Sequence, residues 1–178
     1  MDFIPITTER LQLRTFRLED GLSFYPLASD PDATRYMAWP RHKDLAETER
    51  VLGLFAQWRA RDEDWPVALW TKKDPTQLLG FSGFQKPLSG APWVSWLLGP
   101  DAWGKGYAQE AVRALLAWGW AAQPHWRCVQ APIHPDNGAS LRLAQRLGFR
   151  EVPSDLTFKM VNLDGQDHAA TLWQLDRP

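Results

Sequence analysis

Two short stretches of this chain carry residue types at spacings that can do chemistry. The first reads W-G-K-G-Y-A, from Trp103 to Ala108, between an apolar run and a helical pattern. Gly104 and Gly106 have no Cβ, so the chain can turn sharply there and bring backbone N–H groups close to a ligand. Those groups would be the unpaired donors of a helix N-terminus, where negative charge is favoured. The stretch therefore predicts a site for phosphate or pyrophosphate.

Three phosphate-binding motifs are candidates for this short Gly-Lys-Gly sequence, and two of them do not fit. A P-loop needs Ser or Thr directly after its Lys, but Lys105 is followed by Gly106. A dinucleotide fingerprint needs a third glycine where this chain has Gln109. The acyl-CoA loop pattern, Q/R-x-x-G-x-G/A, fits except that Trp103 stands at its first position. An ordinary strand-to-helix turn is the alternative for the hexapeptide taken alone.

The second stretch contains Asn137, Ser140, Gly148 and Phe149, spaced as N-x-x-S followed by seven residues and G-F. Asn137 or its neighbour Asp136 is a good helix N-cap, and Gly148 suits the position just after a helix. Taken alone, this pattern also describes any capped amphipathic helix.

The two stretches, in this order and with a strand expected between them, resemble the signatures of the GNAT N-acetyltransferases. W-G-K-G-Y-A is similar to the loop of the branch with the ribosomal-protein alanine N-acetyltransferases, and T-E-R-L-Q-L-R near the N-terminus resembles the same branch. The resemblance implies an α/β fold of the α+β kind, the GNAT acyl-CoA N-acyltransferase fold. Its central mixed sheet would be mostly antiparallel, with one parallel, splayed strand pair, flanked by helices. Residues 1–178 would form a single N-acetyltransferase domain.

Hydrophobic periodicity and turn residues predict the elements that position these stretches. Strands are expected at 7–17, 65–71, 77–85, 93–98, 126–133, 156–162 and 170–174, helices at 18–29, 31–37, 44–61, 107–122 and 137–147, and a loop at 87–92. The crossover from 93 to 148 predicts parallel pairing of strands 93–98 and 126–133. Gly80 and Gly83 within a strand indicate a bulge, a bend or a close neighbour. Leu22, Tyr25 and Leu27 are expected to be the apolar residues of the first helix.

The resemblance implies acetyl-CoA as the acetyl donor, with no metal. Backbone groups near Trp96, Leu97 and Leu98 would bind the pantetheine arm between the splayed strands. The pyrophosphate would lie on the loop of Trp103, Gly104, Lys105, Gly106, Tyr107 and Ala108, and we expect the amide of Lys105 rather than its ammonium to touch it. Asn137 would either bond the arm or cap its helix.

The same resemblance assigns candidate catalytic residues. Ser140 matches a serine of this branch and is the candidate for contacting the departing thiolate, although a small helix residue that bonds its own backbone is the alternative. The tyrosine that many GNAT enzymes use is replaced by Ala144, and the usual glutamate before the loop is Trp93. His134 is the candidate base, directly or through water, while a structural role in its His-Pro-Asp turn is the alternative. Glu110 is expected to be an acidic residue in the first helical turn, where the helix dipole favours negative charge.

The acceptor is expected to be a primary amine, first of all the α-amine of a protein or peptide. With no evident base, an α-amine with pKa near 8 is favoured over a lysine near 10.4 because more of it is neutral at pH 7. Alternatives are a small amine such as a polyamine or an amino sugar, or a catalytically silent CoA-binding module. An amino-sugar acceptor would prefer an acidic pocket, which Asp30, Asp32 and Asp44 could line, but solvated loop carboxylates are the favoured interpretation of these residues. Tryptophans 39, 58, 65 and 70 are candidates for either cleft wall or core.

The composition limits the classes of partner that the sequence indicates. Twenty basic and twenty-one acidic residues give a formal net charge of -1, so neither nucleic acid nor an anionic membrane is indicated. No apolar segment approaches the roughly 20 residues of a membrane span, and a cytoplasmic monomer or homodimer is expected. The single cysteine, Cys128, is expected to be a buried strand residue.

Overall fold

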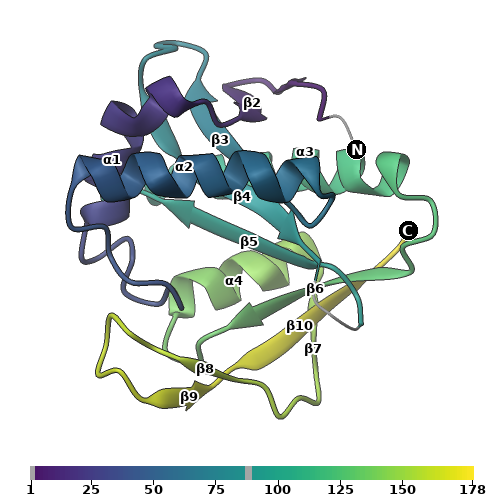
Figure 1. Cartoon of the computed structure of the whole chain (residues 1–178). Helices are drawn as coiled ribbons and strands as arrows, with labels where there is room; N and C mark the ends of the chain where they lie inside the picture. Colours follow the sequence, from purple (N-terminus) through teal and green to yellow (C-terminus); the bar gives the residue numbers. More distant parts are fainter. Residues whose placement is uncertain (1–2, 87–89) are drawn as a thin grey trace.

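The computed structural model describes residues 3–86 and 90–178, and its centre is a mixed sheet (Figure 1). In these residues the sheet has eight strands in the order β1-β2-β3-β4-β5-β6-β10-β7. Their bounds are β1 Ile6–Thr7, β2 Leu11–Thr15, β3 Asp64–Thr71, β4 Leu78–Gln85, β5 Trp93–Leu98, β6 Cys128–Ile133, β7 Arg150–Val152 and β10 Thr171–Asp176. β8 (Thr157–Lys159) and β9 (Asp167–Ala169) form a separate hairpin.

Four α-helices flank the sheet in the described residues: α1 Gly21–Ser29, α2 Leu45–Ala60, α3 Tyr107–Ala122 and α4 Gly138–Leu147. Short 3-10 turns at Leu18–Asp20 and Pro100–Ala102 precede α1 and the glycine loop. Asp44 caps α2 by accepting the N–H of Glu47. The predicted N-cap of α4 is confirmed, since Asn137 accepts the N–H of Ser140. Gly148 ends α4 in the left-handed conformation, at φ 91°.

Side chains alternate along the strands, so the sheet has two apolar faces. In β3, Trp65, Val67 and Leu69 belong to a cluster shared with α3, whereas Ala68 and Trp70 belong to a second cluster shared with α1 and α2. Both faces are therefore covered by helices (Figure 1). All strand pairs of the large sheet are antiparallel except β5 with β6, which confirms the expected mixed sheet.

β5 and β6 are held together at one end only. In the described residues their ladder consists of one pair, Trp93 with Gln130, supported by the bond from Gln130 N–H to the Pro92 carbonyl at 2.9 Å. Along a strand, the backbone N–H groups of every second residue point toward the same neighbouring strand. After Gln130, the next residue of β6 that would donate to β5 is therefore Pro132, which has no N–H. The strands then diverge toward their C-terminal ends (Figure 1). The missing donor gives a local reason for the predicted splay.

The two strand glycines mark close approaches of neighbouring backbones, as predicted. A Cβ on Gly80 would collide with the carbonyl oxygen of Leu97, and one on Gly83 would lie 2.7 Å from the carbonyl oxygen of Trp65. Close to Gly80, the pairing of β3 with β4 shifts register between Leu69 and Trp70.

Several sequence-based expectations about the elements are wrong. Residues 31–36 form turns rather than a helix. The Asp30 carboxylate accepts the N–H groups of Asp32 and Ala33, as a helix N-cap would, but the Met37 N–H then bonds the Thr34 carbonyl in a tighter turn, and the Asn162 side chain also donates to that carbonyl. Leu22 is 75% exposed and faces away from the core. Cys128 is only half-buried at the start of β6.

The tail departs from the expected two strands around residues 164–165. There β8 pairs with β9, while β10 enters the large sheet between β6 and β7. Part of the expected loop at 87–92, residues 87–89, lies outside the described residues.

Replacing Gly80 by Ala tests the close approach of β4 and β5. The added methyl has no room against the Leu97 backbone, so we expect the free energy of unfolding to fall by about 1–3 kcal/mol or more. Gly53→Ala is the matched control, because a Cβ there has no neighbour within 4 Å and helix propensity favours Ala by about 1 kcal/mol. Urea unfolding of the two variants measures both effects. Equal stability of the two would contradict the packing.

Candidate functional site

A cleft of about 670 Å³ opens where β5 and β6 diverge, between the start of α3 and the start of α4. It brings together almost all of the residues that the sequence predicted for acyl-CoA binding: Trp96, Leu97, Leu98, Trp103, Gly104, Gly106, Tyr107, Ala108, Asn137 and Ser140. Lys105 does not line the cleft; its side chain shows no described partner there, and its carbonyl accepts Nη1 of Arg10 at 2.8 Å.

The glycine loop presents the N-terminus of α3 to this cleft. Gly104 and Gly106 have φ of 71° and 79°, values that favour glycine. Gly106 is the N-cap and carries no side chain, so the first amides of α3 are not satisfied by a side-chain cap. The indole of Trp103 donates to the Leu98 carbonyl at 2.8 Å, which ties the loop to the end of β5. This geometry suits a pyrophosphate.

An ion pair from the N-terminal segment holds the loop in place. Nε of Arg10 lies 2.7 Å from Oε2 of Glu110, and the guanidinium also lies over the ring of Tyr107. Oε1 of Glu110 accepts the hydroxyl of Thr8 and the N–H of Arg10. Glu110 therefore has a role beyond its favourable interaction with the helix dipole, because it anchors the start of α3 to the segment before β2.

The protonation of Glu110 follows from these contacts. Burial alone would raise its pKa, but the hydrogen bonds from Thr8 and Arg10 together lower it below the ordinary value of 4.5. A lowered pKa means that the carboxylate stabilises the fold above the ordinary carboxyl range. That contribution is lost as the pH falls through the lowered pKa.

Ser140 lies in the first turn of α4 and has a fixed hydrogen-bond partner across the cleft. The indole Nε1 of Trp96 donates to its Oγ at 3.0 Å, and the backbone N–H of Ser140 donates to Oδ1 of Asn137. Since Oγ accepts from Trp96, the hydroxyl hydrogen of Ser140 is left to donate elsewhere. The side chain of Asn137 serves as the N-cap of α4, one of its two expected roles.

His134 lies at the end of β6, where it is 5% exposed and stacks on Tyr36. Its Nδ1 accepts the N–H of Asp136, so its Nε2–H donates to Nδ1 of His168 at 3.1 Å. Nε2–H of His168 then donates to Asp164 at 2.9 Å. Burial lowers the pKa of His134 and favours the neutral ring. Direct proton acceptance by His134 would need one of its two hydrogen bonds to open.

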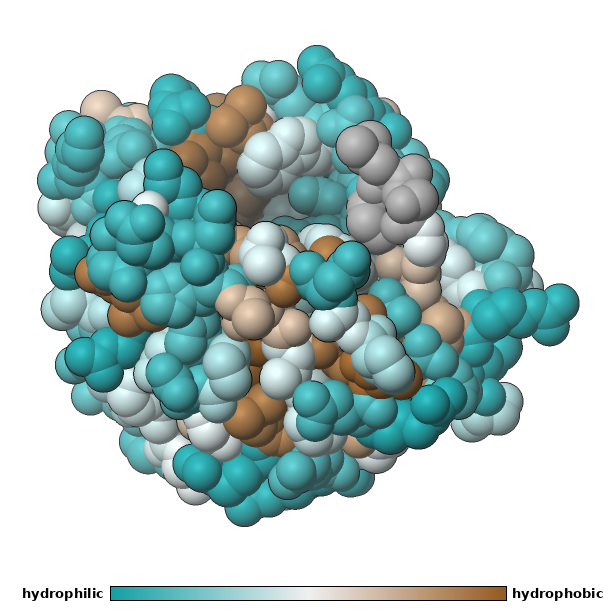
Figure 2. All heavy atoms as spheres, turned by 90° about the horizontal axis from the view of Figure 1, so that it is seen from below, coloured by the Kyte–Doolittle hydropathy of each residue, from teal (hydrophilic) through white to brown (hydrophobic). Residues whose placement is uncertain are grey.

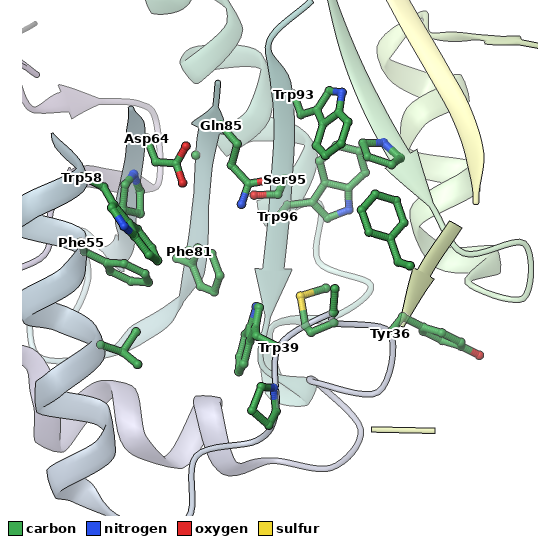
Figure 3. A pocket seen from close by; sticks show the side chains of 18 of the residues that line it. Tyr36, Trp39, Phe55, Trp58, Asp64, Phe81, Gln85, Trp93, Ser95 and Trp96 are labelled. Carbon is green, nitrogen blue, oxygen red and sulfur yellow. The ribbon is translucent and has the colours of Figure 1, made fainter. Parts of the chain in front are cut away.

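A second cavity of about 370 Å³ shares Tyr36, Met37 and Trp96 with the cleft. Its floor is the α2-side face of β3, β4 and β5, and its walls are mostly aromatic (Figure 3). The aromatic lining residues are Phe24, Tyr36, Trp39, Phe55, Trp58, Phe81, Phe84, Trp93, Trp96 and Phe158. Figure 2 shows the molecule hollowed on the face seen from below, with hydrophobic residues beside the hollow.

The second cavity also contains groups that the sequence did not single out. Asp64 lies at the first position of β3, and burial raises the pKa of its carboxyl. His42 is 7% exposed, and its Nδ1 lies 2.8 Å from the hydroxyl of Thr48. That hydroxyl donates to the Asp44 carbonyl, so Nδ1 of His42 carries the hydrogen and Nε2 keeps its lone pair. Burial lowers the pKa of His42.

The three aspartates considered for an acidic acceptor pocket do not gather in one pocket. Asp44 caps α2 and Asp30 stabilises the turn at 31–36, whereas Asp32 lines the larger cleft. Of the four tryptophans, Trp39 and Trp58 line the second cavity, while Trp65 and Trp70 are core residues, 1% and 4% exposed.

Three arginines at the cleft were also missed. Arg35, Arg142 and Arg146 line it, and they come from the turn after α1 and from the exposed face of α4. In a sequence, Arg142 and Arg146 look like an ordinary solvated helix face, so only the fold identifies them as cations at a phosphate-sized site.

A family model described as an acetyltransferase (GNAT) domain matches residues 10–150 of the chain. The chain belongs to the GNAT acetyltransferase family. This GNAT chain is 28% identical over 146 residues to p20, an uncharacterized N-acetyltransferase of Bacillus licheniformis, and the match covers 81% of each protein.

Solved structures confirm the GNAT fold. The chain resembles a GNAT-family acetyltransferase from Bacillus anthracis, with a TM-score of 0.80 and 20% identity over 97% of this chain and 98% of the other. It also resembles RimL, a ribosomal L7/L12 α-N-protein acetyltransferase in complex with coenzyme A, with a TM-score of 0.81, 18% identity, and coverage of 97% and 98%. In the described residues of this GNAT chain, no helix is long and apolar enough to cross a membrane, and no cluster of three or more His, Cys, Asp or Glu could hold a metal.

Arg10→Met tests the anchoring of the glycine loop in this GNAT protein. The variant keeps an apolar stem and the backbone bond to Glu110, but it loses the guanidinium bonds to Glu110 and to the Lys105 carbonyl, so the loop should be less ordered before it binds a ligand. We expect the Kd for coenzyme A, measured by calorimetry, to rise about tenfold. Arg150→Met, which removes an exposed pair with Asp176 far from the loop, should leave this Kd unchanged. An unaltered Kd in Arg10→Met would show that the ion pair does not support the loop.

Proposed function

We propose that this GNAT protein transfers the acetyl group of acetyl-CoA to a primary amine, first of all the α-amine of a protein or peptide N-terminus. The observation that carries the proposal is the meeting of two cavities at Trp96: one suits a phosphate-bearing thioester, the other suits an acceptor. The likeness to RimL, a ribosomal L7/L12 α-N-protein acetyltransferase, supports the choice of acceptor.

The larger cleft would hold the donor through main-chain groups and cations. The amides at the start of α3 would bind the pyrophosphate, and Arg35, Arg142 and Arg146 would offset the remaining phosphate charge. The pantetheine arm would occupy the gap beside Pro132, hydrogen-bonding backbone groups of β5 near Trp96, Leu97 and Leu98. A β5 amide facing the thioester oxygen would stabilise the developing oxyanion, a contribution of about 3 kcal/mol where one such donor matters.

Ser140 would assist the departure of the thiolate. In the reaction a C–N bond forms, the C–S bond breaks, and the proton that the amine nitrogen loses balances the proton that the sulfur gains. The hydroxyl of Ser140 is free to donate to the sulfur because Trp96 supplies the hydrogen bond that its oxygen accepts. Trp96 would thus act as a positioning residue for Ser140.

The amine must attack in its neutral form. An α-amine needs little help at pH 7, since roughly a tenth of it is already neutral. His134 remains the proposed base. It would accept the proton at Nδ1 once the bond from the Asp136 N–H opens, and its Nε2–H would pass a proton through His168 toward Asp164 at the surface. A small-molecule amine is the second candidate acceptor, and the aromatic lining of the second cavity favours it over an open peptide groove.

Release of coenzyme A thiol measures the proposed activity. The protein is incubated with acetyl-CoA and an N-terminal alanine peptide, its N-acetylated form, or no acceptor. We expect thiol release only with the free α-amine. A shift in melting temperature with coenzyme A and no thiol above background would instead identify a binding module without turnover.

Ser140→Ala and Trp96→Phe test the protonation of the leaving group. Ser140→Ala should lower kcat about 100-fold with little change in the Kd for coenzyme A, because the interaction is made only as the C–S bond breaks. Trp96→Phe keeps an aromatic ring but not the N–H, so it should lower kcat less. The double variant should be no slower than Ser140→Ala, since both changes act on one hydroxyl. Additive losses in kcat would separate Trp96 from Ser140.

A further inference from the structure

Asp64 is the carboxylate that faces the second cavity from its sheet floor. It is paired across the strands with Gln85, on the same face of the sheet as Pro66 and Gly83. Figure 3 shows Asp64 and Trp58 on one side of the cavity, and Trp93 and Trp96 on the other. The carboxylate is therefore remote from Ser140, which is hydrogen-bonded to Trp96.

The charge of Asp64 is incompletely satisfied within the protein. Its Oδ1 accepts the backbone N–H of Lys86 at 3.2 Å, and Oδ2 has no partner among residues 3–86 and 90–178. Burial disfavours its charged form, so the pKa of this carboxyl is raised. The carboxylate is half-buried and has no cation partner in the described residues, so a cationic ligand group in the cavity would stabilise its charged form.

The other acidic side chain of the cavity, Glu47, already has partners. Its Oε2 accepts the N–H of Lys43 at 2.8 Å, and its Oε1 lies 3.9 Å from Arg50. Asp64 is thus the carboxylate in this cavity with capacity left for a ligand.

The walls next to Asp64 suit a cation on an apolar stem. Trp58, Phe55 and Phe81 lie around the same end of the cavity (Figure 3). Aromatic faces attract guanidinium and ammonium groups, and their surfaces also cover methylene groups well. Neighbouring strands are about 4.8 Å apart, so β3 and β5 are separated by roughly 10 Å. An acceptor bound near β5 would need a long side chain to reach Asp64 on β3.

We propose that the acceptor carries, next to its reactive amine, a side chain with an apolar stem that ends in a cation, and that this cation binds Asp64. Arginine or lysine at the first position of a peptide has this chemistry. The inference rests on the proposed function, because it assumes that the amine is acetylated near Trp96. It makes Asp64 a specificity-determining residue for the acceptor, not a group that touches the reacting atoms.

L-Argininamide and L-citrullinamide provide a matched test. Each has one α-amine that can be acetylated, and they differ only in whether the tip of the side chain is charged. We expect kcat/KM for argininamide to exceed that for citrullinamide by about tenfold, mainly through KM. Asp64→Asn should bring this ratio close to one. Asp62→Asn, which removes an exposed carboxylate near Lys86, should preserve the ratio and controls for net charge.

The outcomes distinguish this inference from the proposed function. Equal turnover of argininamide, citrullinamide and alaninamide by the wild-type protein would overturn the role of Asp64 and leave the acetyltransferase proposal standing. If no amine gave thiol release, the proposed function would fail. Calorimetry of argininamide with the protein–coenzyme A complex would then still test whether Asp64 binds a cation. Tighter binding of argininamide than of citrullinamide, lost in Asp64→Asn, would support the cation site, whereas equal binding would overturn it. An unchanged Kd for coenzyme A would show that each variant is folded.

Discussion

The architecture of the site depends on one hydrogen-bond donor that the chain lacks. Pro132 occupies the position in β6 whose amide would extend the ladder to β5, and the parallel pair stops after Trp93 and Gln130. Beyond that stop the strands part, the end of β5 has no ladder with β6, and α4 begins beside the gap. A central strand normally avoids proline for this reason. Here the loss of pairing between two strands leaves room for a third extended segment, which in the proposed complex is the pantetheine arm.

Trp96 joins the two halves of the proposed reaction. It lies in the wall between the cleft and the aromatic cavity, and its indole hydrogen bond to Ser140 crosses from β5 to α4. One side chain therefore borders the space for the donor, the space for the acceptor and the hydroxyl proposed to serve the leaving group. The replacement of the usual glutamate by Trp93 fits the same picture, because an aromatic ring there extends the wall of the acceptor cavity.

Local signals in the sequence were sufficient for the glycine turn before α3 and for the caps of α4, because each is determined by residues close together in the chain. The parallel strand pair was predicted from the order of strand, helix and strand. The turn at 31–36 was mistaken for a helix because carbonyls in and after it accept from Asn162, which is distant in the sequence. Arg10 with Glu110, and Trp96 with Ser140, join segments distant in sequence, so no local pattern could reveal them. Asp64 looked like an ordinary charged residue at a strand end, and only the cavity around it gives it a candidate role.

The contact of Arg10 with Glu110 and Lys105 has a thermodynamic consequence for the N-terminal segment. The guanidinium bridges the strand edge near β1 and β2 to the loop proposed to grip the pyrophosphate. If the order of the glycine loop depends on the order of the β1–β2 edge, coenzyme A binding and the docking of these strands are thermodynamically linked. Each then favours the other by the same free energy. Amide hydrogens around Thr8 and Leu11 would then exchange more slowly with solvent when the distant cleft is filled, although they touch no ligand.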